Sequence, residues 1–83
     1  MSIRLHPHAL ERMVERGATQ EEVIATATGG ERFPVKFGRQ GFRRNFAYHG
    51  RWRGKQYASK QVEVIAAQED GDWLVISVMV QYF

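Results

Sequence analysis

The chain contains no cysteine, which excludes disulfide bonds and thiolate metal ligands. Long apolar runs are also missing. No segment approaches the roughly 20 apolar residues that a membrane-spanning helix needs, and the N-terminus lacks the apolar stretch of a signal peptide. We therefore expect one soluble cytoplasmic domain over residues 1–83, with no membrane contact.

Acidic residues are missing from one long stretch of the chain. Residues 32–60 hold nine Lys and Arg and no Asp or Glu, so the net charge of +3 hides a sharp segregation. Such a stretch projects a positive potential that attracts polyanions. RNA is the partner we expect. An acidic protein is the alternative, and a solvated basic face without a ligand is the simplest explanation.

Several catalytic and cofactor motifs are absent as well. There is no P-loop, no Gly-x-Gly-x-x-Gly after a strand and no Gly-x-Ser-x-Gly. His6, His8 and His49 are the only histidines, and no His-x-x-x-His or carboxylate cluster accompanies them. We therefore predict neither a metal site nor a cofactor.

Two short helices are predicted in the first 30 residues. Pro7 suits the first position of a helix, and Gly17 reads as its left-handed C-cap. Thr19 and Glu22 form a capping box that opens a second helix, which stops at Gly29-Gly30. The short linker predicts that the two helices form a tight pair. The first helix should bury a stripe made of Ala9, Leu10, Met13 and Val14.

The rest of the chain reads as strands at 32–37, 42–49, 61–68 and 73–83. The first is expected at a sheet edge, where it could pair in a homodimer, and the last is apolar on both faces, as in a central strand. Asp70 and Gly71 indicate a hairpin turn. The predicted fold is α+β: an N-terminal helical hairpin packed on a mostly antiparallel twisted sheet of about four strands.

Three residues are candidates for catalysis. His8 and Arg12 share one face of the first helix, and Lys60 could project towards them from the sheet. Histidine moves protons near neutral pH, and cations stabilise the extra charge of a pentacoordinate phosphate. In the simpler interpretation, His8 caps or packs, Arg12 pairs with Glu11 or Glu15, and no reaction takes place.

A second group of residues is predicted to bind RNA. Trp52 lies between Arg51 and Arg53 at a turn-rich tip, where it could stack on an unpaired base while the arginines hold the backbone. Alternatively, Trp52 folds down onto the sheet or is buried in a partner. The remaining predicted RNA-binding residues are Arg16, Arg43, Arg44 and Tyr82.

The segment His8–Thr19 resembles the opening signature of the bacterial domain-of-unknown-function family 4258, which reads His-Ala-x-x-Arg-Met-x-x-Arg-Gly. His8, Arg12 and Arg16 match that signature, whereas Ser77 stands where many relatives have threonine. The resemblance implies a RelE-like or BrnT-like toxin fold. It also implies a metal-independent ribonuclease of a toxin–antitoxin pair, which uses the 2′-hydroxyl of the RNA and leaves a cyclic phosphate.

Three functions are compatible with these features. The first is an RNA-cleaving, toxin-like enzyme with a companion antitoxin. The second is a module that binds RNA or an acidic protein without chemistry, because no set of residues fixes a complete acid–base pair. The third is an interaction protein whose basic surface has no dedicated ligand.

Overall fold

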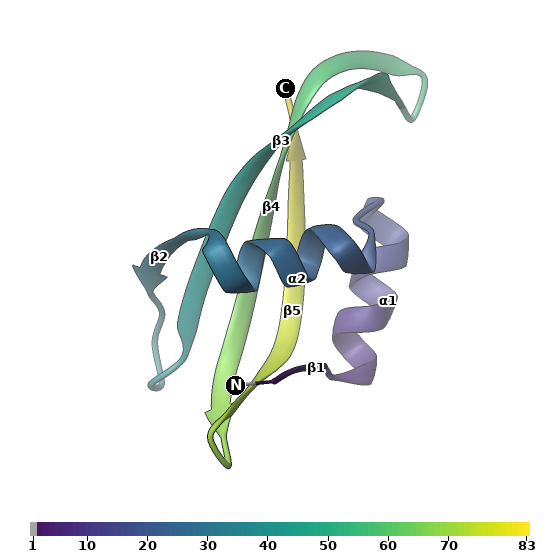
Figure 1. Cartoon of the computed structure of the whole chain (residues 1–83). Helices are drawn as coiled ribbons and strands as arrows, with labels where there is room; N and C mark the ends of the chain where they lie inside the picture. Colours follow the sequence, from purple (N-terminus) through teal and green to yellow (C-terminus); the bar gives the residue numbers. More distant parts are fainter. Residues whose placement is uncertain (1) are drawn as a thin grey trace.

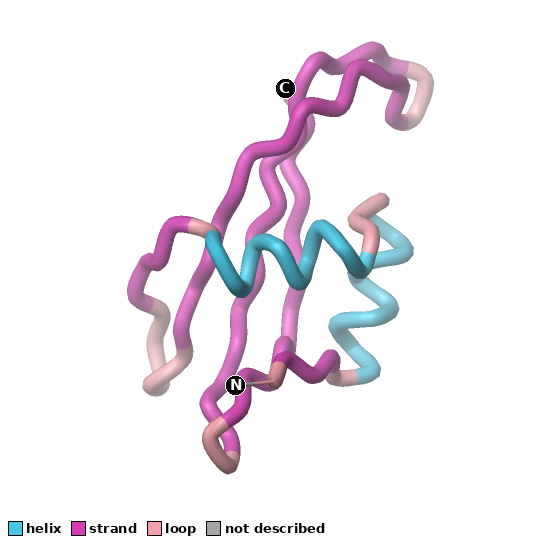
Figure 2. The backbone as a smooth tube through the Cα atoms, viewed as in Figure 1, coloured by secondary structure: helices cyan, strands magenta, loops and turns pink. Residues whose placement is uncertain are grey.

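The computed structural model describes residues 2–83, which form one five-stranded sheet and two helices (Figure 1). In chain order the elements are β1 (Ile3–Leu5), α1 (Pro7–Arg16), α2 (Gln20–Gly29), β2 (Glu31–Pro34), β3 (Gln40–Trp52), β4 (Lys55–Glu69) and β5 (Asp72–Tyr82). The strand order is β1-β5-β4-β3-β2. β3 and β4 are long, and Figure 2 shows them continuing as a hairpin beyond the rest of the sheet.

The predicted fold class is wrong in two respects. The sheet has five strands and is mixed, because β1 precedes the helices and pairs in parallel with β5, while the other neighbours are antiparallel. The helices also do not form a hairpin that packs as a unit. α1 lies against β5, and α2 crosses β4 and β3 (Figure 1). The turn at Gly17, whose φ is 79°, sends the second helix across the strands.

The helix ends follow the sequence signals closely. His6 caps α1 through its Nδ1, which accepts from the His8 backbone N–H at 3.1 Å. Gly17 adopts the left-handed conformation that ends α1. Thr19 Oγ1 accepts from the Glu22 N–H at 3.1 Å, and the Glu22 carboxylate accepts from the Thr19 N–H at 2.9 Å. The predicted capping box is therefore confirmed.

One hydrophobic cluster fills the space between the helices and one face of the sheet. Along β4, Val62, Val64 and Ala66 are fully buried, whereas the intervening side chains, which point to the opposite face, are only partly buried. α2 covers the buried side (Figure 1). The opposite face, called the open face below, is not covered by a helix anywhere in residues 2–83.

A β-bulge shapes the open face beside β5. The register between β4 and β5 shifts at Ile65, so that Val75 and Val78 are both buried although they are three residues apart. The extra residue changes the direction in which Ile76 and Ser77 point. None of the helices in the described part of the chain is long and apolar enough to cross a membrane.

Candidate functional site

Two open grooves lie along β5. The first, called the histidine groove, has a volume of about 430 Å³ and is lined by His6, His8, Arg39, Ile65, Ile76 and Ser77. The second, called the arginine groove, has a volume of about 410 Å³ and is lined by Arg16, Trp52, Arg53, Met79, Val80 and Tyr82. They lie at opposite ends of α1 and at neighbouring segments of β5. These grooves hold five of the ten residues predicted for catalysis or RNA binding.

The histidine groove combines two imidazoles with one guanidinium. The rings of His6 and His8 stack with centroids 5.1 Å apart and an interplanar angle of 3°. Because His6 Nδ1 accepts the His8 N–H, a neutral His6 ring carries its proton on Nε2 and can donate a hydrogen bond from that atom. Arg39 approaches from the loop between β2 and β3. No acidic side chain lines this groove, so it offers a site for an anion.

The loop that supplies Arg39 also carries an exposed aromatic residue. Phe37 is 88% exposed and has a φ of 63°, a conformation that is rare for a bulky residue. Lys36 and Arg39 flank it. Sequence reasoning missed Phe37 and Arg39, although an aromatic residue between two cations is the pattern that singled out Trp52.

The arginine groove is built on stacked aromatic rings. Trp52 lies parallel to Tyr82 at 4.9 Å, and the Arg53 guanidinium lies 5.4 Å from the centre of the Trp52 ring. The Tyr82 hydroxyl donates to the Arg16 carbonyl at 2.8 Å, and the Arg16 side chain donates to the Val78 carbonyl at 2.6 Å. Trp52 thus packs onto the sheet, as the simpler interpretation had it, and the rings tie the β3–β4 hairpin to α1.

Burial raises the pKa of the Tyr82 hydroxyl above its ordinary value, and the nearby Tyr48 and Glu22 groups raise it further. The phenol therefore stays protonated over the whole neutral range and remains a hydrogen-bond donor to Arg16. Through this hydrogen bond, Tyr82 supports the wall of the arginine groove.

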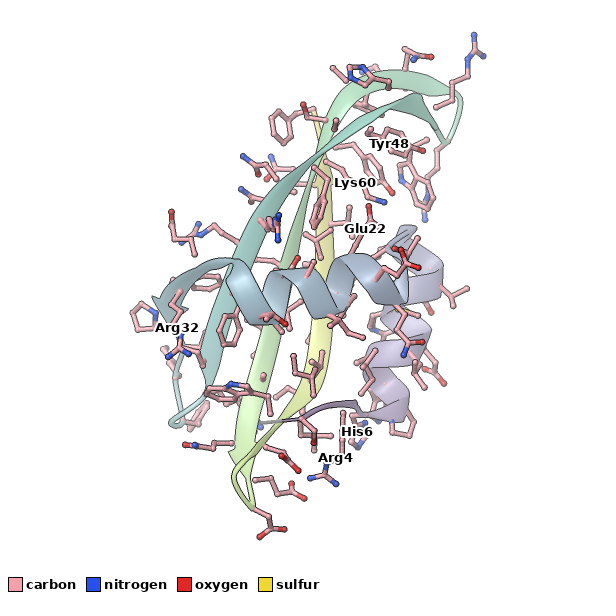
Figure 3. The ribbon with its side chains drawn as sticks, viewed as in Figure 1. Arg4, His6, Glu22, Arg32, Tyr48 and Lys60 are labelled. Carbon is pink, nitrogen blue, oxygen red and sulfur yellow. The ribbon has the colours of Figure 1, made fainter. Side chains whose placement is uncertain are left out.

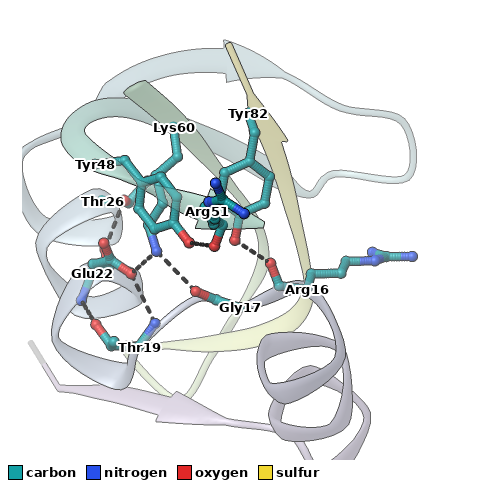
Figure 4. A network of polar contacts seen from close by, with 9 residues as sticks. All are labelled: Arg16, Gly17, Thr19, Glu22, Thr26, Tyr48, Arg51, Lys60 and Tyr82. Atoms are coloured by element: carbon teal, nitrogen blue, oxygen red, sulfur yellow. Dashed lines mark hydrogen bonds and ion pairs between the residues drawn. The ribbon is translucent and has the colours of Figure 1, made fainter. Parts of the chain in front are cut away.

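Lys60 does not reach the histidine groove. It is only 4% exposed and projects to the helix-covered face, opposite to Ile65. Its Nζ lies 2.7 Å from a Glu22 carboxylate oxygen and donates to the Gly17 carbonyl at 2.8 Å (Figure 4). Figure 3 shows Lys60 pointing towards Glu22, near Tyr48. The three predicted catalytic residues therefore do not meet at one site.

Arg12 is also engaged. Its guanidinium donates to both carboxylate oxygens of Glu15, at 3.0 and 3.2 Å, as the simpler interpretation had it. Arg43 pairs with Glu31 at 3.3 Å. Arg44 and Arg51 are exposed outside both grooves. The acid-free segment thus distributes its cations over both faces of the sheet and the hairpin tip.

The residues described here offer no centre for a metal, because residues 2–83 contain no group of three or more His, Cys, Asp or Glu arranged to hold one. No family model, curated protein or solved structure matches the chain. The resemblance of His8–Thr19 to family 4258 therefore stays a prediction.

Proposed function

We propose that this protein binds single-stranded RNA and cleaves it at the histidine groove without a metal ion. The observation that carries the proposal is the convergence of two imidazoles and the Arg39 guanidinium on one open groove without a carboxylate. Imidazoles can exchange protons near neutral pH, and a guanidinium binds phosphate oxygens in a bidentate manner.

The chemistry follows from these groups. His8 accepts the proton of a ribose 2′-hydroxyl, whose oxygen forms a bond to the adjacent phosphorus. The neutral His6 ring donates a hydrogen bond from its Nε2–H to a phosphate oxygen, and the departing 5′-oxygen takes a proton from water in the open groove as the P–O5′ bond breaks. Arg39 stabilises the additional negative charge of the phosphorane between these events. The products are a 2′,3′-cyclic phosphate and a free 5′-hydroxyl, and the two ring centres, 5.1 Å apart, are close enough for both rings to contact one phosphodiester.

Phe37 supplies the contact to a base. Stacking on an aromatic ring suits an unpaired base of any identity, and Lys36 and Arg39 are placed on the same loop to hold the flanking phosphates. This arrangement favours single-stranded over double-helical RNA, because stacked and paired bases present no free face.

A second candidate function is RNA binding without cleavage. It is favoured by the ion pairs that engage Arg12 and Lys60, two of the three residues predicted for catalysis. A toxin role with an antitoxin companion rests on the family resemblance alone. Growth arrest on expression, with rescue by the product of an adjacent gene, would support that role.

The chemistry is tested with one labelled RNA oligonucleotide in EDTA, beside a matched oligonucleotide that carries a 2′-deoxyribose at the main cleavage position. The proposal predicts cleavage of the first, a cyclic phosphate on the product, and protection of the second at the substituted position. Binding of both without cleavage would establish the second candidate. Absence of binding to either would overturn the proposed function.

A further inference from the structure

The outer edge of β5 has no strand partner along most of its length. β1 pairs only with Trp73, Leu74 and Val75, so that within residues 2–83 no strand lies beside β5 from Ile76 onward. On the other side of the sheet, the edge strand β2 has four residues and ends at Pro34, which cannot donate a hydrogen bond. α1 packs against β5, and Val78 is fully buried, so the free edge of β5 is the segment Val80–Tyr82.

The hydrogen bonds of β5 determine which of its groups face outward. Phe83 and Ser59 exchange two backbone hydrogen bonds, at 2.8 and 3.0 Å, so the groups of Phe83 point towards β4. Directions alternate along a strand, which turns the N–H and C=O groups of Val78, Val80 and Tyr82 away from β4. Val78 is fully buried and its carbonyl is taken by Arg16, which leaves Val80 and Tyr82 on the free edge. The Arg16 side chain confirms this direction, because it reaches the Val78 carbonyl from outside the sheet at 2.6 Å.

These backbone groups lie beside a basic rim. The arginine groove places Arg16 and Arg53 along Val80 and Tyr82, and none of its lining side chains is acidic. The edge therefore offers the outward backbone donors and acceptors of Val80 and Tyr82 together with two positive charges. A partner must satisfy both features.

We propose that the free edge of β5 pairs with an extended acidic segment of another protein, which adds a strand to the sheet. A peptide backbone repeats its donors and acceptors at the same spacing as β5, and acidic side chains complement Arg16 and Arg53. A second copy of this chain fits less well, since pairing β5 with β5 would bring the two basic rims together. RNA fits less well too. Its phosphates cannot donate to the β5 carbonyls, and Tyr82 and Arg53 already cover Trp52.

The edge proposal stands apart from RNA cleavage. The free edge consists of Val80 and Tyr82, whereas the histidine groove is lined by Ile76 and Ser77 of the same strand. A strand added at the edge would lie next to the histidine groove, so its binding can be measured with or without RNA.

The probe is a seven-residue peptide of alternating glutamate and valine, titrated into the full-length protein. The proposal predicts saturable binding that weakens with salt, and amide NMR shifts with slowed hydrogen exchange at Val80 and Tyr82. A peptide of the same sequence with alternate N-methyl groups, which cannot form the ladder, should bind at least about tenfold more weakly. A seven-residue peptide of alternating lysine and valine should not bind. Equal binding of the N-methylated peptide would overturn strand pairing without affecting the RNA proposal.

Protein variants provide the second arm. Val80→Pro removes one outward donor that has no strand partner, and proline is tolerated at such an edge. We expect it to fold and to weaken peptide binding about tenfold, whereas Val80→Thr should bind as the wild type does.

Arg53→Glu should weaken binding and Arg44→Glu, which makes the same charge change outside the groove, should not. A concentration-dependent dimer that excludes the peptide, or an RNA oligonucleotide that shifts Val80 and Tyr82 when the peptide does not, would overturn the proposal.

Discussion

Lys60 of β4 and Glu22 of α2 form an ion pair with 2.7 Å between Nζ and the nearest carboxylate oxygen, although Lys60 is almost completely buried. Lys60 also donates to the Gly17 carbonyl, so one side chain connects the sheet to the end of α1 and the start of α2 (Figure 4). Its charge is further stabilised by the rings of Tyr48 and Tyr82, whose centres lie 5.3 and 5.9 Å away.

The first prediction concerns this ion pair. Glu22→Gln keeps the shape of the capping side chain but leaves the buried ammonium without a counter-ion, and should lower the free energy of unfolding by about 3 kcal/mol. Lys60→Met should cost less, because the remaining Glu22 carboxylate is partly exposed and still accepts from the Thr19 N–H. Urea unfolding measures both. If Lys60→Met folds but loses RNA cleavage, Lys60 belongs to the catalytic machinery and our account of it is wrong.

The second prediction concerns the tight turn after α1. Gly17 has a φ of 79°, and a Cβ at this position would overlap the Tyr82 hydroxyl and the Trp52 ring. Gly17→Ala should therefore lower the free energy of unfolding by about 3 kcal/mol, from backbone strain and displaced rings together. Gly71→Ala is the matched control: its φ is 80° and nothing lies within 4 Å of the added carbon. Gly71→Ala should lower the free energy of unfolding by only about 1 kcal/mol. Equal costs would show that the aromatic rings do not pack against this turn.

The third prediction concerns alkaline pH. The pKa of Tyr82 is raised in the folded protein, chiefly by burial, so on raising the pH its phenol ionises first in the unfolded chain. The stabilisation is complete below the unfolded-state pKa of about 10 and is lost as the pH rises towards the folded-state pKa. Unfolding free energies between pH 8 and 11 should fall for the wild type and fall less steeply for Tyr82→Phe. Identical slopes for the wild type and Tyr82→Phe would show that Tyr82 does not cause this loss of stability.

The fourth prediction separates stability from function at Phe37. Because its φ of 63° strains a bulky residue, Phe37→Gly should raise the free energy of unfolding by about 1 kcal/mol. The same change removes the ring and should weaken binding of single-stranded RNA about tenfold or more. Phe37→Trp should retain the affinity. Anisotropy titrations and urea unfolding measure the two effects, and an unchanged affinity in Phe37→Gly would remove Phe37 from the binding site.

Local signals in the sequence were sufficient for the helix ends, one turn and one edge strand. Pro7, Gly17 and the Thr19–Glu22 capping box marked the helix ends correctly, because caps depend on a few adjacent residues. The turn at Asp70–Gly71 was found for the same reason. Residues 32–37 were correctly expected to hold an edge strand, which the structure places at Glu31–Pro34.

Long-range pairings were not accessible from these signals. β1 has only three residues, and its parallel pairing joins Ile3–Leu5 to Trp73–Val75, about 70 residues away in the chain. Without β1, the last strand was expected in the middle of the sheet, whereas it has no strand partner on its outer side beyond Val75. The ion pair between Glu22 and Lys60 likewise depends on α2 crossing the sheet, which no local pattern specifies.

The candidate site was predicted only in part. His8 lines the histidine groove, but Arg39 takes the position expected of Lys60 as the accompanying cation. Arg39 follows a turn in which Phe37 and Gly38 both have positive φ, and that turn aims the loop across the open face. Charge counts alone could not distinguish Arg39 from the other eight Lys and Arg residues of the acid-free segment 32–60.

The most direct test of the account is the single-turnover rate of RNA cleavage in EDTA by the wild type, His8→Ala, Arg39→Ala and His49→Ala. His49 is an exposed histidine outside both grooves, so it controls for the loss of an imidazole. We predict that His49→Ala cleaves at the wild-type rate and that His8→Ala and Arg39→Ala are each slower by about a hundredfold or more. Cleavage at equal rates by all four proteins, or by none, would contradict catalysis at the histidine groove.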